Sequence, residues 1–222
     1  MAGLDVAANL ADVRDRVAAA SGLAGRTDEV TIVGVSKKQS RDRLVAAYEG
    51  GLRDFGENRA QELAEHRAWL PDDVRWHMIG PLQRNKVRMV RPIVHQLHSM
   101  DRRSLADAWI KGPGLPPPVF VQVNVGEEPQ KSGVAPADLS EFIDDLGGLG
   151  IRAIGLMAIP PRGAPEDARA WFQVMARLRD QTVGEHPIVT GLSMGMSDDF
   201  ELAIELGSTC IRVGRAIFGA RK

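Results

Sequence analysis

The sequence predicts an α/β fold: a single (β/α)8 barrel of the TIM type with an extra N-terminal helix. Two observations favour this fold class. Eight short apolar runs recur along the chain, and helical patterns lie between them. Parallel neighbouring strands need such crossovers, and eight units of strand and helix are the number that closes a barrel. An open doubly wound sheet is the alternative that the same pattern allows.

The N-terminal helix is predicted from the spacing of its apolar residues. Leu4, Leu10, Val13 and Val17 lie on one helical face, and the pattern ends near Gly22. Strands are expected at 30–36, 52–55, 75–79, 93–98, 118–125, 151–157, 188–192 and 209–213. Helices between them are expected at 41–50, 59–70, 84–91, 102–111, 136–147, 165–184 and 197–206. We expect one barrel domain that spans 1–222.

Composition narrows the class of protein. The net charge of −1 leaves no broad electrostatic footprint for nucleic acid, and no apolar run reaches the length that spans a bilayer. The N-terminus has no basic stretch before a hydrophobic run, so no signal or transit peptide is expected. The single cysteine, Cys210, excludes an internal disulfide and is expected to be a buried thiol. We therefore expect a cytoplasmic protein without nucleic acid or membrane partners.

Metal and nucleotide sites are not indicated by any spacing. His95 and His98 lie three residues apart on a predicted strand, which should turn them to opposite faces. Neither the glycine-rich loop that binds nucleoside triphosphates nor the dinucleotide-binding glycine motif is present. The basic residues of 84–91 are interpreted as a solvated helix face, with an anionic partner as the alternative.

Lys37 is the first candidate functional residue, because the active site of such a barrel lies at the carboxyl ends of its strands. Alternation along the first strand places Val33, Val35 and Lys37 on one face, and Lys38 on the other. A lysine that faces the barrel interior can be desolvated, which lowers its pKa and frees the amine to attack a carbonyl. The alternative is that both lysines belong to a solvated strand end.

The end of the last predicted strand supplies a second candidate site. Gly214 lets the backbone approach a ligand, and the segment 214–217 resembles the short helix start at which barrels bind phosphate. Ser193 can add a hydroxyl donor. A tight turn is the alternative. Arg212 lies within the strand and is costly to bury without a partner, so it pairs either with an acid such as Glu57 or with a ligand.

Asp198 and Asp199 precede the helix expected at 197–206 and are interpreted as capping residues rather than catalytic ones.

Seven motifs together resemble the pyridoxal-phosphate homeostasis protein family, whose members have an alanine-racemase-like barrel. The resemblance covers nearly the whole chain. The motifs are Val35-Ser36-Lys37, Phe55-Gly56-Glu57-Asn58, the segment 76–83 with Asn85-Lys86, Lys131-Ser132-Gly133, Gly155-Leu156-Met157, the segment 192–199, and Ile211-Arg212-Val213-Gly214 with Ile217-Phe218-Gly219. Each motif alone is weak, but their number and order make the match specific.

The resemblance implies that the cofactor is pyridoxal 5′-phosphate (PLP), held as a Schiff base on Lys37. It implies that Arg212 faces the pyridine nitrogen and that Asn58 contacts the ring side. Ser193, Gly214 and the following residue would hold the phosphate. That residue is usually threonine in the family and is Arg215 here. The backbone N–H then suffices, or the guanidinium takes over, or the side chain points away.

A second departure is the loop after Lys37, where many members have Lys-Pro and this chain has the residues 38–40, Lys-Gln-Ser. Lys131 is a second candidate residue for cofactor attachment.

The resemblance implies a PLP-binding protein of intracellular PLP homeostasis, which passes PLP to acceptor enzymes without efficient turnover of amino acids. Racemases with this barrel use a tyrosine from a second domain, whereas the only tyrosine here, Tyr48, is predicted in the first crossover helix. A weak amino-acid racemase or another PLP-dependent enzyme is the main alternative. A cofactor-free lyase of the aldolase type and an interaction module are the others.

Overall fold

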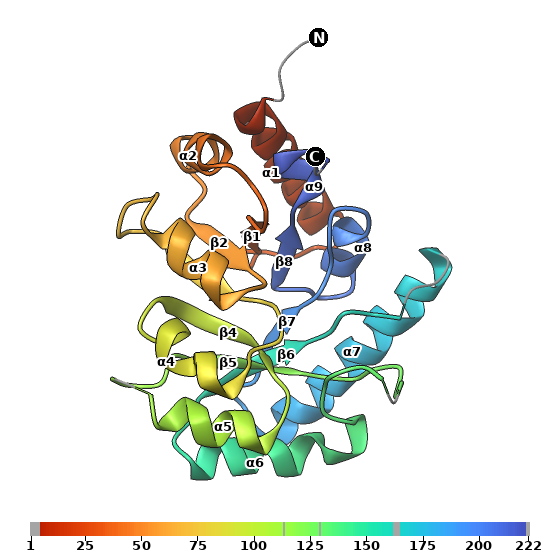
Figure 1. Ribbon diagram of the computed structural model, residues 1–222. Coiled ribbons are helices and arrows are strands. Elements are labelled where there is room, and N and C mark those ends of the chain that lie inside the picture. Colours follow the sequence, from red (N-terminus) through yellow and green to blue (C-terminus); the bar gives the residue numbers. More distant parts are fainter. Residues whose placement is uncertain (1–4, 113, 129, 162–164, 221–222) are drawn as a thin grey trace.

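A computed structural model describes residues 5–112, 114–128, 130–161 and 165–220. It confirms the predicted fold class, because eight parallel strands form a closed barrel in which neighbours along the chain pair with each other (Figure 1). The last strand returns to the first, with residues 31–34 opposite 210–213. The two ends of the described chain therefore meet along one seam of the barrel.

The strands are short and the helices lie outside them (Figure 1). The strands are β1 (Thr31–Val35), β2 (Asp54–Glu57), β3 (Arg75–Met78), β4 (Val94–Met100), β5 (Val119–Gln122), β6 (Ala153–Met157), β7 (Gly191–Ser193) and β8 (Cys210–Val213). The helices are α1 (Val6–Leu23), α2 (Arg41–Glu49), α3 (Ala60–Arg67), η1 (Arg84–Lys86), α4 (Val87–Val90), α5 (Arg103–Ile110), η2 (Pro136–Asp138), α6 (Leu139–Gly148), α7 (Pro165–Glu185), α8 (Phe200–Glu205) and α9 (Arg215–Phe218). In the described part of the chain, no helix combines the length and apolarity that crossing a membrane requires.

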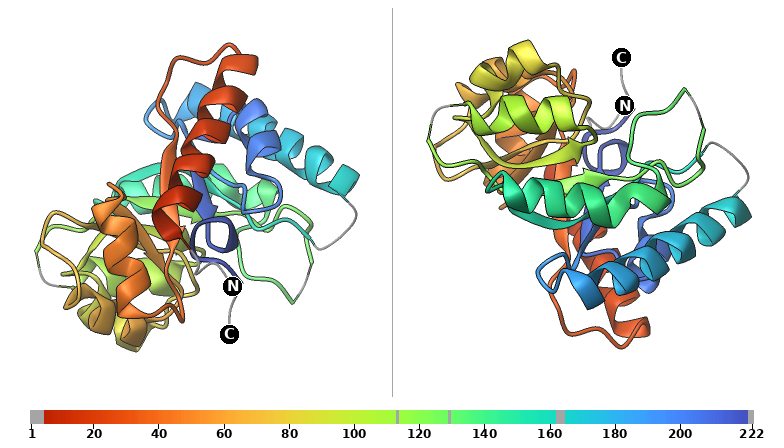
Figure 2. Two further views of the ribbon diagram at one scale, coloured as in Figure 1. Left: turned by 90° about the horizontal axis from the view of Figure 1, so that it is seen from above. Right: turned by 90° about the horizontal axis from the view of Figure 1, so that it is seen from below.

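The extra N-terminal helix, α1, is present as predicted. The Asp5 carboxylate accepts a hydrogen bond from the Ala8 backbone N–H at 2.9 Å, as an N-cap residue does. Leu10 and Val13 are fully buried on its inner face, whereas Leu4 lies outside the described residues. The helix packs against α8 and α9, beside the seam between β1 and β8 (Figure 2).

The apolar core has two parts. The larger part lies between the strands and the surrounding helices. The smaller part comprises Val33, Ile79, Phe120, Met157 and Cys210, with Val35 packed against it. This smaller cluster fills the barrel interior, so Val33 and Val35 share one face as predicted, and that face is the inner one. Cys210 is buried as predicted, and its burial raises the pKa of the thiol to about 12.

Strand boundaries differ from the predicted ones where polar residues enter a strand. The sequence predicts a strand at 52–55, but pairing with β3 extends β2 to Glu57. The Glu57 carboxylate is fully buried, and its Oε1 atom lies within hydrogen-bond distance of Ser36 Oγ and His66 Nδ1, at 2.5 and 2.7 Å. Within the described residues its Oε2 atom has no hydrogen-bond partner. The strand predicted at 188–192 is confined to β7, because its first residues form a turn before the sheet.

One strand pair contains an irregularity that matters for the site. The register between β3 and β4 shifts between Trp76 and His77, which leaves His95 as an extra residue. The His95 and His98 rings both lie near the His77 ring, at centroid distances of 5.9 and 5.1 Å. The simple alternation expected for His95 and His98 is therefore wrong, although His95 is exposed and His98 is buried.

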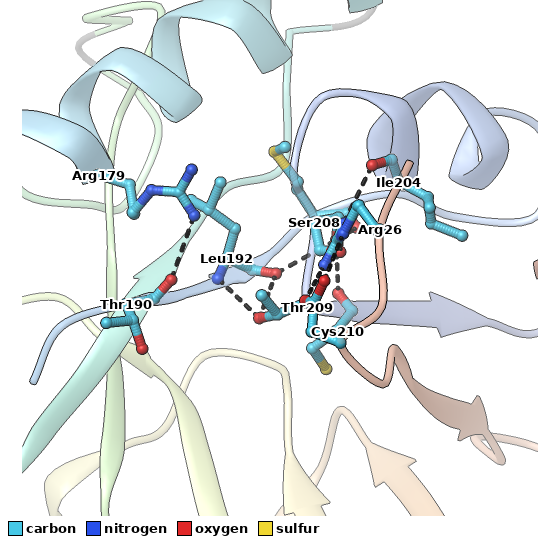
Figure 3. A network of polar contacts seen from close by, with 10 residues as sticks. Arg26, Arg179, Thr190, Leu192, Ile204, Ser208, Thr209 and Cys210 are labelled. Carbon is cyan, nitrogen blue, oxygen red and sulfur yellow. Dashed lines mark hydrogen bonds and ion pairs between the residues drawn. The ribbon is translucent and has the colours of Figure 1, made fainter. Parts of the chain in front are cut away.

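The starts of β7 and β8 are held by a network of polar contacts (Figure 3). Arg26, in the loop between α1 and β1, donates from Nη1 to the Ser208 carbonyl at 2.6 Å. The Leu192 N–H donates to the Thr209 hydroxyl at 2.9 Å, and the Ser208 hydroxyl is fully buried against backbone carbonyls. This network fixes the two strands on which the candidate site depends.

Arg91 corrects the interpretation of 84–91 as one solvated basic face. Its side chain is buried and donates to the backbone carbonyls of Ile110 and Gly114. It therefore fastens the loop before β5, and its burial lowers the pKa of the guanidinium. Arg84 and Arg88 are exposed as expected.

Candidate functional site

Lys37 and Lys38, which follow β1, differ in their exposure to solvent. Lys37 is half-buried and follows the inward-facing Val35 by two residues. Lys38 is exposed, has a left-handed backbone with φ of 58°, and its backbone N–H donates to the Glu62 carboxylate at 3.0 Å. Both lysines lie in the turn that follows β1, and they differ in exposure and in backbone conformation.

Asn58 follows β2 at the same end of the barrel. Its Oδ1 atom is buried and, within the described residues, has no hydrogen-bond partner. It lines a cavity of about 310 Å³ together with Gly80, Asn124 and Lys131. Gly80 has to be a glycine, because a Cβ there would lie 2.4 Å from the Asn58 carbonyl oxygen. The cavity therefore offers an unsatisfied acceptor to a ligand.

Arg212 is buried inside the barrel, with 5% of its surface exposed. Its Nη1 donates to the carbonyl and the hydroxyl of Ser193, both at 2.6 Å, and its Nη2 donates to the Ala158 carbonyl at 2.9 Å. Burial lowers the pKa of the guanidinium. These contacts use three of its five N–H groups, which leaves the others for a ligand at the mouth.

The ion pair considered between Arg212 and Glu57 is not formed. Arg212 follows the inward-facing Cys210 by two residues, whereas the Glu57 carboxylate is held outside the strands by Ser36 and His66. Alternation turns the two side chains to opposite sides of the barrel wall. The described contacts of Arg212 are instead to neutral oxygens.

Ser197 is a residue that the sequence analysis did not single out. Its hydroxyl oxygen lies 3.3 Å from both the Gly214 and the Ala216 backbone nitrogens, at the start of α9. Gly214 adjoins Val35 on β1, since a Cβ at Gly214 would lie 3.4 Å from the Val35 Cβ. Ser197 belongs to the same Ser-Met-Gly-Met-Ser segment as Ser193, which was the available signal.

Ser193 lies deeper than expected. Its side chain is fully buried in the barrel, where the hydroxyl contacts Arg212 and lies 2.9 Å from His98 Nδ1. Arg215, the first residue of α9, has an exposed guanidinium that pairs with Asp198. Of the three alternatives for Arg215, the side chain thus points to a surface partner and the backbone N–H stays at the helix start.

The aspartates after Ser197 do not cap α8 with their side chains. Asp199 occupies the N-cap position without a side-chain capping bond, and its carboxylate accepts from the Met196 N–H at 2.6 Å. Tyr48 lies in α2 as predicted, and its hydroxyl donates to Asp73 at 2.9 Å.

Comparison with known proteins identifies the family. The model of the alanine racemase N-terminal domain matches residues 8–222. Pyridoxal phosphate homeostasis proteins of Aquifex aeolicus and Pseudomonas aeruginosa are 40% and 42% identical to this chain, over 96% and 97% of it and 97% and 96% of their own lengths. The chain belongs to the pyridoxal phosphate homeostasis protein family.

One solved structure that is similar to this chain is PipY of Synechococcus elongatus with PLP bound. It is 33% identical, has a TM-score of 0.84, and the alignment covers 96% of this chain and 100% of PipY. Alanine racemase of Corynebacterium glutamicum shares only the fold, with 16% identity and a TM-score of 0.75 over 97% of this chain and 61% of the racemase.

Proposed function

We propose that this protein binds PLP covalently through Lys37 and serves intracellular PLP homeostasis in the cytoplasm, without efficient turnover of amino acids. The observation that carries the proposal is the buried Arg212 guanidinium. Its described hydrogen bonds go to the oxygens of Ser193 and Ala158 and to no carboxylate, so its remaining N–H groups are available to a ligand. Relatives named for PLP homeostasis and the PLP-bound structure of PipY support the choice of cofactor.

The donor set fits the chemical groups of PLP. A phosphate needs several N–H or O–H donors, and the start of α9 offers backbone N–H groups beside the Ser197 hydroxyl. In this proposal the Arg215 backbone N–H donates to the phosphate, and the Gly214 N–H, which donates to Ser197 in the protein without ligand, turns to the phosphate as well. Asn58 contributes its buried amide at the ring side. When bound, PLP supplies an aldehyde for an amine and an electron-withdrawing ring.

Arg212 limits the chemistry that this site supports. A guanidinium stays protonated and can only donate hydrogen bonds. A pyridine nitrogen that faces it therefore accepts a hydrogen bond and carries no proton of its own, which weakens the ring as an electron sink. This is the physical reason to expect retention and release of PLP rather than rapid amino-acid chemistry.

Ser193 takes a different role in the proposal from the one first expected at the phosphate. Its hydroxyl oxygen accepts a hydrogen bond from Arg212 inside the barrel, and Ser197 supplies the hydroxyl next to α9. The release of PLP to acceptor enzymes is the functional step that we infer for the loaded protein. Lys131, which lines the cavity beside Asn58, is a second amine near the mouth.

The proposal is tested by labelling. The protein is mixed with PLP, its visible absorption is recorded, and borohydride reduction followed by peptide mass mapping locates the adduct. We expect a visible band and one adduct on Lys37, both lost in Lys37→Gln and retained in the matched control Lys38→Gln. A fixed adduct on another lysine in the wild-type protein would exclude Lys37. Rapid racemisation of an amino acid, lost with Lys37→Gln, would favour the enzyme alternative.

A further inference from the structure

The barrel interior contains a chain of polar side chains among its apolar residues. Asp54, His77, His98, Ser193 and Arg212 come from five different strands, and each is largely or fully buried. Interiors of such barrels are usually filled by branched apolar side chains. Buried polar groups are costly unless they are hydrogen-bonded, so their partners determine what these five residues do.

Each member of the chain lies within hydrogen-bond distance of the next. Arg212 Nη1 lies 2.6 Å from Ser193 Oγ, and Ser193 Oγ lies 2.9 Å from His98 Nδ1. His98 Nε2 lies 3.0 Å from His77 Nδ1, and His77 Nε2 lies 2.9 Å from Asp54 Oδ1. The chain thus connects the candidate ligand site to the far end of the barrel, where Asp54 and His77 line a second cavity of about 350 Å³.

The direction of these hydrogen bonds follows from the acid at the far end. Burial alone would raise the pKa of Asp54, but hydrogen bonds from His77 and Arg75 outweigh it and lower this pKa to about 2. The carboxylate therefore only accepts, and His77 Nε2 must be the donor. If the His77 ring carries only this one proton, its Nδ1 accepts, and His98 then donates from Nε2.

The hydrogen bonds between His98, Ser193 and Arg212 run in the same direction. Burial holds the pKa of His98 well below its ordinary value, so the ring is neutral and accepts at Nδ1. The Ser193 hydroxyl donates to that nitrogen and accepts from Arg212. The Cys210 thiol also lies within hydrogen-bond reach of Ser193, and a hydroxyl oxygen has a second acceptor position for it. Every proton is thus donated away from the guanidinium and towards the carboxylate.

We propose that Asp54, His77 and His98 are positioning residues that act through Ser193 to orient the Arg212 guanidinium towards the mouth of the barrel. Asp54 fixes the tautomer of His77, His77 fixes that of His98, and His98 fixes the hydroxyl rotor of Ser193. The oxygen of Ser193 is then always turned to accept from Arg212. The inference rests on the proposed function for the ligand that Arg212 meets, whereas the chain of hydrogen bonds is a property of the protein alone.

The first test replaces Asp54 with asparagine, which keeps the size but gives the far end a group that can donate. In the ligand-free protein, ¹⁵N chemical shifts of the imidazoles should show His98 protonated on Nε2 in the wild type and a changed tautomer in Asp54→Asn. PLP affinity, followed by the visible band, should fall about tenfold, the lower end of what loss of an outer-shell partner costs a metal site. The matched control is Asp73→Asn. It removes a carboxylate that contacts Arg53 and Tyr48 and is not part of the hydrogen-bonded series from Asp54 to Arg212.

A second pair of variants keeps the inference testable if Asp54→Asn does not fold. His98→Asn retains a side-chain acceptor near the Nδ1 position, whereas His98→Phe removes it and resembles the neighbouring Phe120 in shape. We expect His98→Phe to weaken PLP binding and shift the visible band, and His98→Asn to recover most of both. Wild-type binding and absorption in folded His98→Phe would overturn the inference.

Different results would contradict the proposed function and the proposed positioning role of Asp54, His77 and His98. If the wild-type protein forms no visible band with PLP, the proposed function falls, and the ¹⁵N measurement still decides the network. A wild-type His98 that carries its proton on Nδ1 would overturn the inference, as would an equal loss of PLP affinity in Asp54→Asn and Asp73→Asn.

Discussion

Arg212 Nη1 lies 2.6 Å from Ser193 Oγ, on the neighbouring strands β8 and β7. The same nitrogen also donates to the Ser193 carbonyl, so one residue holds the guanidinium by two oxygens. Both atoms belong to neutral groups, and the charge of Asp199 partly offsets the lowering of the Arg212 pKa by burial. Because a buried charge is stabilised mainly by the groups that hydrogen-bond it, these contacts decide where the remaining donors of Arg212 point.

Replacing Arg212 with lysine should weaken PLP binding although the charge is retained. An ammonium has no planar fork and cannot reach the Ser193 and Ala158 oxygens together from one position. The buried oxygens that lose their donor should also lower the free energy of unfolding, by about 1–3 kcal/mol. Titration with PLP and urea denaturation measure the two effects. Unchanged affinity and absorption would remove Arg212 from the cofactor site.

Gly80→Ala should destabilise the protein and impair PLP binding, because the added Cβ would collide with the Asn58 backbone. Overpacking of this kind costs about 1–3 kcal/mol. Gly147→Ala is the matched control, since a Cβ there meets nothing within 4 Å and lies on α6. It should stabilise the protein by about 0.5–1 kcal/mol. Thermal unfolding of both variants checks the prediction, and equal effects would contradict it.

Arg215→Ala should leave PLP affinity and stability nearly unchanged. The guanidinium pairs with Asp198 at the surface, where both side chains are mostly exposed, and such pairs contribute little. The backbone N–H at the start of α9 is kept in this variant. Arg215→Thr restores the hydroxyl usual in the family and should bind PLP more tightly. A large loss of affinity in Arg215→Ala would instead assign the guanidinium to the ligand.

Stability should fall in acid partly through Asp54. Its pKa is lowered to about 2 in the folded protein by His77 and Arg75, so its contribution is complete above the unfolded pKa near 4 and is lost as the pH falls towards 2. The shift corresponds to about 2 kcal/mol. Urea denaturation between pH 5 and 2 should show a smaller decline in Asp54→Asn than in the wild type. Parallel declines would mean that Asp54 is not stabilised as a carboxylate by folding.

Most of the fold could be predicted because strands and crossover helices leave different periods in the sequence. The inward face of β1, with Val33 and Val35, follows from alternation alone. The burial of Arg212 at the end of the last strand agrees with the expectation that it needs a partner or a ligand, whereas the direction of Lys37, in the turn after β1, stays a prediction.

The hydrogen-bonded series of buried polar side chains could not be predicted, because its members come together only when strands that are distant in sequence pair with each other. The bulge at His95 further breaks the alternation on which a prediction for His98 depends. Ser193 and Ser197 show the same limit at short range. Four residues separate them, but one hydroxyl lies in the barrel and the other at α9, and only the course of the loop decides which.

The seam between β1 and β8 has a consequence for biosynthesis. The proposed amine is near the beginning of the chain and Arg212, Gly214 and α9 are near its end, so the ribosome makes the two halves of the site far apart in time. Pairing of 31–34 with 210–213 is among the most distant contacts in the fold, and contacts of this kind form late. If Lys37 binds PLP as proposed, a nascent chain would carry it as an ordinary amine, and the site would capture the aldehyde only after the last strand had closed the barrel.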